Sequence, residues 1–90
     1  MKKTVITVIG KDRCGYIASA SAICAQSNVN IVDITQSVLE DMFVMVMLAD
    51  ISGLNCTFGE FSDKMRAFGE KEGLDVRVMH EDIFNAMHRI

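Results

Sequence analysis

The order of apolar and polar positions along the chain predicts a strand followed by a helix in its first third. Residues 3–9 are rich in β-branched side chains on both faces, which is typical of a central strand. Residues 16–27 repeat apolar side chains at helical spacing, at Ile17, Ala20, Ile23 and Cys24. Asn28 tolerates the left-handed backbone, so we expect the helix to end there.

The middle of the chain reads as two strands joined by a tight turn. Residues 29–39 alternate between apolar and polar side chains, as in a strand with one buried face. The apolar face has Val32, Ile34 and Val38, and the polar face has Asp33, Thr35 and Ser37. Residues 40–42 are too few for anything but a hairpin, so residues 43–51 must form an antiparallel partner. That strand is apolar at every position through Ala49, which indicates that both of its faces are covered.

A second helix and a fourth strand complete the pattern. Thr57 and Glu60 have the spacing of a capping box, and the helix that follows carries an apolar stripe of Phe58, Phe61, Met65 and Phe68. Gly73 is a typical helix end, and residues 74–80 alternate as a strand with one solvated face. Residues 81–90 predict a short amphipathic C-terminal helix, with Ile83, Phe84, Met87 and Ile90 on one side.

The predicted element order is β-α-β-β-α-β followed by the tail helix. This order is that of the ferredoxin-like α+β fold, here as a single domain with a core of residues 3–80 and a C-terminal helix of residues 81–90. Right-handed crossovers place both helices on one face of a four-stranded antiparallel sheet with strand order 4-1-3-2. The other face then needs cover from the tail helix, from a second subunit, or from both.

Composition adds limits on partners and location. The chain has 90 residues, of which 50% are hydrophobic, and a chain this short buries only about 60–65% of its unfolded surface. We therefore expect a second subunit to cover part of the apolar surface. The formal net charge is −3, without a basic stripe that would track a nucleic acid. No apolar run approaches the roughly 20 residues of a membrane span, and the start lacks the apolar region of a signal peptide. We expect a cytoplasmic homodimer without a nucleic-acid or membrane partner.

The candidate chemistry lies in the loop between the first strand and the first helix, formed by Gly10, Lys11, Asp12, Arg13, Cys14 and Gly15. A helix that begins near Tyr16 presents free backbone N–H groups and the positive end of its dipole, which favour a carboxylate or a phosphate. Asp12 could hold an ammonium group, so the loop suits a zwitterion such as an amino acid. Asn30 could add a donor and an acceptor only across a subunit boundary or around the strand edge. The alternative is an ordinary exposed turn in which Asp12 caps the helix.

Residues 5–34 resemble the first half of an ACT domain, a small regulatory module of many enzymes of amino-acid metabolism. The hallmark turn of that family is D-R-P-G or N-R-P-G, and this chain has Asp12, Arg13, Cys14 and Gly15. The G-x-N-I run of the family corresponds to Asn28, Val29, Asn30 and Ile31. Cys14 thus replaces the usual proline and Asn28 the usual glycine. The whole chain is similar to small stand-alone ACT-domain proteins of bacteria and archaea, which are related to glycine-cleavage-type transcriptional regulators.

The resemblance implies a dimer or higher oligomer with an amino acid bound at the interface. We therefore predict a regulatory module without enzyme activity, cofactor or metal, whose ligand changes its assembly and so acts on a protein partner. The predicted ligand contacts are Gly10, Lys11, Asp12, Arg13, Cys14, Gly15, Tyr16, Ile17 and Asn30. The alternative is a dimerisation or protein-interaction module that binds no ligand.

Other chemistries match the sequence less well. Cys14, Cys24 and Cys56 form no CxxC or zinc spacing, so we interpret them as reduced thiols, and a redox role stays open only for Cys14. An acylphosphatase-like enzyme would need an arginine and an asparagine, which Arg13 with Asn30 or Asn55 could supply, but the local pattern of that family is missing.

Two further sets of side chains have a structural interpretation and a functional one. His80 and His88 flank acidic residues, and a solvated helix face explains them better than a metal site does. The methionines Met42, Met45, Met47 and Met79 fit packing under the tail helix or a partner subunit better than a promiscuous binding surface.

Overall fold

The fold is a four-stranded sheet with two helices, seen in a computed structural model that describes residues 2–11 and 15–82. Its elements are β1 (Lys3–Lys11), α1 (Tyr16–Gln26), β2 (Asn30–Leu39), β3 (Met42–Asp50), α2 (Phe58–Glu72) and β4 (Asp75–His80). The order is the predicted one, and the bounds differ from the predicted bounds by one or two residues. The predicted C-terminal helix, residues 81–90, lies outside the described residues from residue 83 onward.

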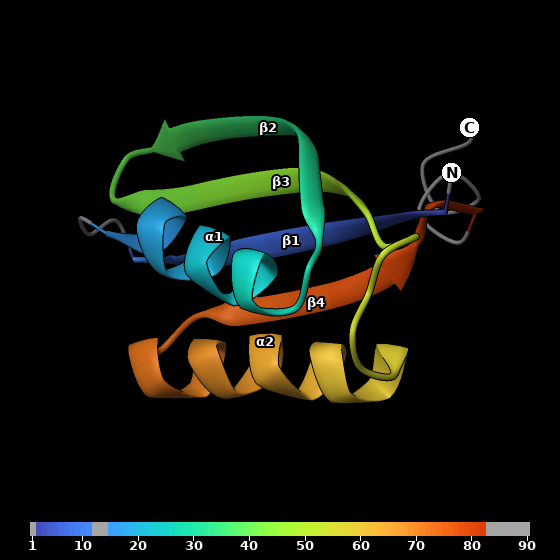
Figure 1. Ribbon diagram of the computed structural model, residues 1–90. Coiled ribbons are helices and arrows are strands. Elements are labelled where there is room, and N and C mark those ends of the chain that lie inside the picture. Colours follow the sequence, from blue (N-terminus) through green and yellow to red (C-terminus); the bar gives the residue numbers. More distant parts are fainter. Residues whose placement is uncertain (1, 12–14, 83–90) are drawn as a thin grey trace.

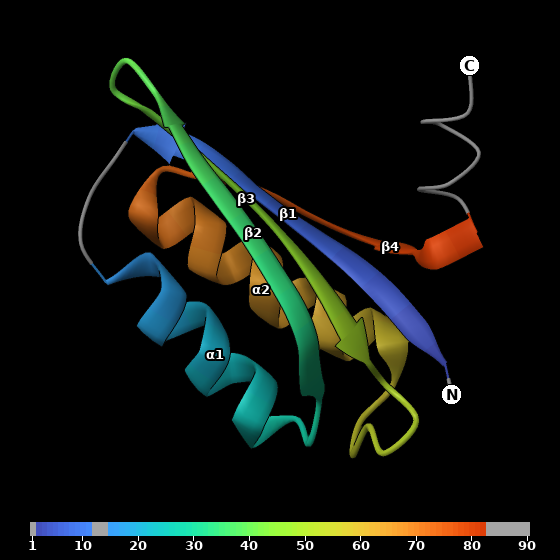
Figure 2. The ribbon, with the colours of Figure 1, turned by 90° about the horizontal axis from the view of Figure 1, so that it is seen from above.

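The sheet has the strand order β2-β3-β1-β4, and every pair of neighbouring strands is antiparallel. Both helices lie on the same side of this sheet (Figures 1 and 2). The ferredoxin-like α+β fold and the predicted strand order are therefore confirmed. β1 is central, between β3 and β4, while β2 forms one edge of the sheet.

The core fills the space between the sheet and the two helices. The sheet contributes Ile6, Val8, Phe43, Met45, Met47, Ala49 and Val76, and the helices contribute Tyr16, Ala20, Cys24, Phe61, Met65 and Phe68. Met45 and Met47 are completely buried between the sheet and these two helices, so the prediction that the tail helix or a partner subunit covers them is wrong for these two methionines. The α2 stripe packs as predicted, whereas Phe58 at its start is only half-buried and stacks on His80 with ring centroids 4.7 Å apart.

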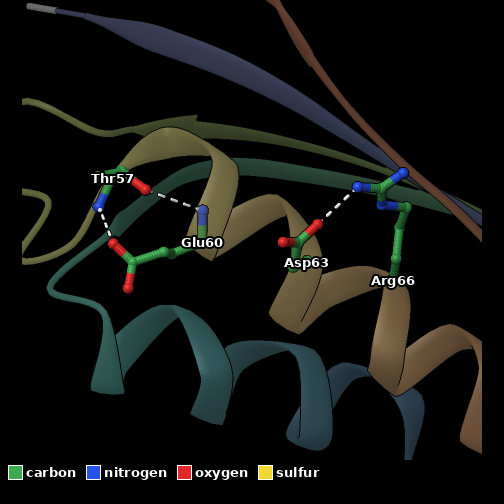
Figure 3. Close-up of polar contacts among 4 residues, drawn as sticks. All are labelled: Thr57, Glu60, Asp63 and Arg66. Carbon is green, nitrogen blue, oxygen red and sulfur yellow. Dashed lines mark hydrogen bonds and ion pairs between the residues drawn. The ribbon is translucent and has the colours of Figure 1, made fainter.

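Local capping signals define both ends of α2. The hydroxyl of Thr57 accepts the N–H of Glu60 at 3.1 Å, and the carboxylate of Glu60 accepts the N–H of Thr57 at 3.2 Å (Figure 3). Gly73 adopts φ 72° and its N–H donates to the carbonyl of Gly69, which ends the helix. A side chain at Gly69 would come within 2.7 Å of Val76 Cγ2, so glycine lets α2 lie close to β4. The predicted capping box and helix end are confirmed.

Two features of the sheet go beyond the alternation of the sequence. A β-bulge between Ile31 and Asp33 makes Val32 the extra residue of β2, and its side chain is 45% exposed. On the face without helices, the side chains of Val44, Val46 and Leu48 are only half-buried. We predicted that both faces of β3 would be buried. Within the described residues, only the face towards the helices is fully buried.

Candidate functional site

The predicted loop is framed by close packing at its first residue. β1 extends to Lys11, so Gly10 and Lys11 of the predicted loop belong to this strand, and the prediction that the strand ends before Gly10 is wrong. Asp12, Arg13 and Cys14 lie outside the described residues. A Cβ atom at Gly10 would overlap the side chain of Leu74 and lie 3.4 Å from its Cα atom. Glycine at this position therefore lets the start of β4 pass close to the end of β1.

Tyr16 joins the two ends of the loop. Its hydroxyl donates to the carbonyl of Lys11 at 2.9 Å, and its ring packs on Phe43 with centroids 5.5 Å apart. The side chain is 4% exposed and belongs to the core. Tyr16 is one of the predicted ligand contacts, and the sequence pattern gives no sign of this burial. The hydroxyl is already engaged within the chain.

The N-terminus of α1 has little compensation from its own helix. Gly15 occupies the N-cap position with φ 92° and offers no side chain to accept a backbone N–H. The first turn carries no acidic residue, and residues 16–26 contain no charged residue at all. The positive end of the α1 dipole thus lies beside Ile17 and the loop without a negative charge from the helix itself.

Asn30 does not lie near this loop within one chain. It begins β2 and is exposed, at the level of the sheet where Asp50 pairs with Lys3. Lys11, where the loop starts, lies at the level of Met42 and Leu39. Eight residues of β1 separate the two levels, which corresponds to roughly 27 Å. The chain therefore places Asn30 and the loop at opposite ends of the sheet.

The remaining candidates lie elsewhere. Cys24 is 1% exposed, and burial raises its pKa to about 11, so its thiol stays protonated and acts as core filler. Cys56 is half-buried, and both thiols are free. The side chain of Asn55 donates to the carbonyl of Gln26 at 2.9 Å, which places it at the end of α1 opposite to the loop. Asn55 thus does not join Arg13 in one site of a single chain.

The region around His80 holds a polar hollow. Lys2, Lys3, His80, Glu81 and Asp82 line a space of about 230 Å³ at one end of the sheet. Among residues 2–11 and 15–82, no group of three or more His, Cys, Asp or Glu side chains could hold a metal ion. His88 lies outside the described residues. In the part of the chain that the structure describes, no helix is long and apolar enough to cross a membrane.

Comparison with known proteins identifies the family. The family model described as "ACT domain" matches residues 2–79. A UPF0237 protein from Methanopyrus kandleri is 47% identical over 90 residues, which covers all of both chains. Among solved structures, an ACT domain protein from Streptococcus pneumoniae superposes with a TM-score of 0.79 at 33% identity, covering 97% of this chain and 98% of the other.

A more distant structure shares the fold alone. A putative glycine cleavage system transcriptional repressor has a TM-score of 0.68 at 21% identity, and it covers 86% of this chain but 44% of its own. The chain belongs to the ACT domain family, and its relatives are small UPF0237 proteins of archaea and bacteria.

Proposed function

We propose that this ACT domain is a regulatory module without enzyme activity that binds an amino acid between two copies of the chain. Binding at that interface changes the assembly, which a protein partner then senses. One observation carries the proposal: Asn30 and the loop lie at opposite ends of the sheet, near opposite ends of the edge strand β2. Two halves of a site that are separated in one chain can meet across a two-fold axis.

The edge strand β2 is suited to pair with a second copy. It is ten residues long, and within the described residues it has a neighbouring strand on one side only. It contains no proline and a single charged residue, Asp33, so its protection as an edge strand is limited to that charge and the bulge at Val32. The opposite edge, β4, has only six residues and presents both Asp75 and Arg77.

The symmetry of such a pair brings the two halves of the site together. A two-fold axis through the middle of β2 sets Asn30 opposite Leu39 of the partner subunit. Because Leu39 lies at the level of Lys11, Asn30 arrives at the end of the sheet where the loop of the other copy begins. The dimer would thus contain two equivalent sites, each built from the loop of one copy and Asn30 of the other.

The chemistry of this combined site fits a zwitterion. The N–H groups at the start of α1 and the helix dipole favour the carboxylate, and no acidic residue of the first turn competes for them. Asp12 supplies a negative charge for the ammonium group, while Lys11 and Arg13 add positive charge for the carboxylate. The amide of Asn30 can donate to the carboxylate and accept from the ammonium group.

A thermal-shift screen with the twenty standard amino acids at millimolar concentration tests the proposal. We expect one or a few of them to raise the melting temperature, because a ligand at 100 times its Kd stabilises the folded state by about 2.7 kcal/mol. Asp12→Ala and Asn30→Ala should each remove the response. Asn55→Ala is the matched control, since it removes an exposed asparagine at the other end of α1 and should keep the response. If no amino acid shifts the wild-type protein, the ligand proposal is wrong.

The alternative of a ligand-free interaction module draws support from the exposed hairpin tip. Leu39 is 69% exposed and Met42 47% exposed, beside the tight turn at Glu40 and Asp41. Under this alternative, the double variant with Asp12→Ala and Asn30→Ala behaves like the wild type in every binding assay. If the wild type responds to an amino acid and the double variant does not, the amino-acid site is supported over the alternative.

A further inference from the structure

The face of the sheet without helices has an apolar centre and a polar rim. The central strands β1 and β3 place apolar side chains on it, namely Val5, Ile9, Val44, Val46 and Leu48. The edge strands β2 and β4 place mostly polar and charged side chains at the same levels, namely Asp33, Thr35, Ser37, Asp75 and Arg77, with the apolar Met79 at the level of Val5. An apolar centre within a polar rim is the usual anatomy of a protein interface.

Exposure distinguishes this face from the one that packs on the helices. On β3 the helix-facing Met45, Met47 and Ala49 are completely buried, whereas Val44, Val46 and Leu48 keep part of their surface open. Near the hairpin the same open face is less covered still, because Ile9 is 38% exposed and Met42 47% exposed. Val5, at the other end of this face, is only 3% exposed, so the open apolar surface is formed by Ile9, Met42, Val44, Val46 and Leu48. An open apolar surface of this kind on a short chain indicates a missing partner.

We propose that this face is a second interface between copies of the chain, through which two β2-edge dimers stack sheet on sheet into a tetramer. The inference rests on the edge dimer of the proposed function, but it concerns the other surface of the sheet. It does not require that a ligand is bound.

Area is the first argument for a second copy as the occupant. Nine-residue strands at about 3.4 Å per residue, with a spacing of about 4.8 Å, give one chain a face of roughly 30 by 15 Å. Two such faces bring together roughly 900 Å² of flat area, slightly below the ~1,000 Å² expected of a specific interface. Edge pairing through β2 doubles the sheet, and two doubled sheets bring together roughly 1,800 Å², which is a standard-size interface.

Self-complementarity is the second argument. A two-fold axis between the stacked sheets, at the level of Thr7 and Val46, lays Leu48 over Val44 of the partner subunit. Apolar side chains then meet apolar side chains across the centre, and Val46 faces its own copy. Stacked sheets with aligned strands pack at about −30° with a spacing of about 10 Å, so the β-branched side chains of this face can interdigitate.

The mass in solution, measured by light scattering and sedimentation equilibrium at micromolar concentration, tests the tetramer. The wild type should have a mass of about 40 kDa, four times the 10.0 kDa of one chain. Val46→Glu places two carboxylates against each other at the centre of the stack and should lower the mass to about 20 kDa. Ala67→Glu is the matched control, because it adds the same charge at an exposed position of α2 and should stay at about 40 kDa. If Val46→Glu fails to fold, Val46→Thr keeps the branched shape and should raise the tetramer dissociation constant at least tenfold.

Several outcomes would overturn the tetramer. One is a mass that Val46→Glu leaves unchanged at the wild-type value. Another is a wild-type dimer that becomes a tetramer when residues 83–90 are deleted, since the tail would then be the cover of this face. A third is a wild-type dimer that Val46→Glu converts to a monomer. That result would overturn both the tetramer and the β2-edge dimer. If Val46→Glu lowers the mass of the tetramer but no amino acid raises its melting temperature, the stacking proposal stands and the proposed function is wrong.

Discussion

The two helices pack on the same sheet but differ in how their ends are stabilised. α2 has a reciprocal capping box at its start, a left-handed glycine at its end and an ion pair between Asp63 and Arg66 at 2.6 Å (Figure 3). α1 begins at a glycine with positive φ, without a side-chain cap, and carries no charged residue. One helix is completed by its own side chains, and the other leaves its positive end unopposed by its own helix.

The difference separates stability from binding. Capping satisfies the N–H groups of a helix start within the chain, as Thr57 and Glu60 do in α2. In α1 the N-cap residue Gly15 offers no side-chain acceptor, and this helix start lies beside the loop that resembles the ACT-domain turn. The comparison therefore predicts that changes in α2 act on folding and that changes at the start of α1 act on binding.

The largest effect is expected from Phe61→Ala in α2. The ring is completely buried in the core, and its removal should lower the free energy of unfolding by about 3–5 kcal/mol. Ile23→Ala, at a half-buried position of α1, is the comparison and should cost clearly less. Urea unfolding followed by circular dichroism measures both. Equal losses for the two variants would contradict the larger contribution expected of the completely buried Phe61.

A moderate effect is expected from the capping box. Thr57→Ala removes the acceptor for the N–H of Glu60 and should lower the free energy of unfolding by about 1 kcal/mol. Thr57→Ser keeps the hydroxyl and should remain close to the wild type. Neither variant should alter the amino-acid response, because both change only the N-cap of α2. A changed ligand affinity in Thr57→Ala would show that the two helices are not separate in function.

A smaller effect on stability, with a larger one on binding, is expected from Ala18→Glu. Ala18 is exposed in the first turn of α1, where a carboxylate should stabilise the helix by about 0.3–1 kcal/mol at low salt. The same carboxylate competes with the ligand for the helix start, so calorimetry should show weaker amino-acid binding. Ala25→Glu, exposed in the last turn, is the control that should lose stability slightly and keep the ligand affinity. Unchanged binding in Ala18→Glu would remove the helix start from the site.

The smallest effect is a change with pH. The Thr57 backbone N–H and then its hydroxyl hold the pKa of Glu60 below its ordinary value. A lowered pKa in the folded state adds stability above the unfolded-state pKa, and this contribution disappears as the pH falls through the folded-state pKa. Wild type should therefore exceed Glu60→Gln in stability at pH 7, and the difference should shrink at pH 3. Unfolding curves at both values measure it, and a difference that grows on acidification would contradict the cap.

Local signals were sufficient to predict most of the fold. The pair Thr57 and Glu60 predicted the start of α2, and Gly73 predicted its end. Asn28 adopts the left-handed backbone that was expected of it, with φ 58°. Its side chain also donates to the carbonyl of Gly53 at 2.7 Å, a contact that no short-range pattern shows. These signals work because caps and turns depend on residues only a few positions apart.

The candidate site was predictable only in its residue types. The distance between Asn30 and the loop depends on the register of three paired strands, which alternation alone does not determine. The burial of Tyr16 depends on Phe43, which is distant in sequence. The bulge at Val32 likewise arises from pairing with β3 rather than from a local motif. Contacts between distant residues are therefore where the structure added most.

The central claim is that one binding site is shared between two copies of the chain, and mixing two inactive variants tests it most directly. Asp12→Ala and Asn30→Ala homodimers each lack one half of every site, so neither should respond to the amino acid that the screen identifies. After subunit exchange, half of the dimers are mixed and each mixed dimer holds one intact site, so about a quarter of all sites should bind again. Calorimetric titration of the mixture should recover that fraction at wild-type affinity. If the mixture binds no more ligand than the two unmixed variants, the site is not shared between subunits.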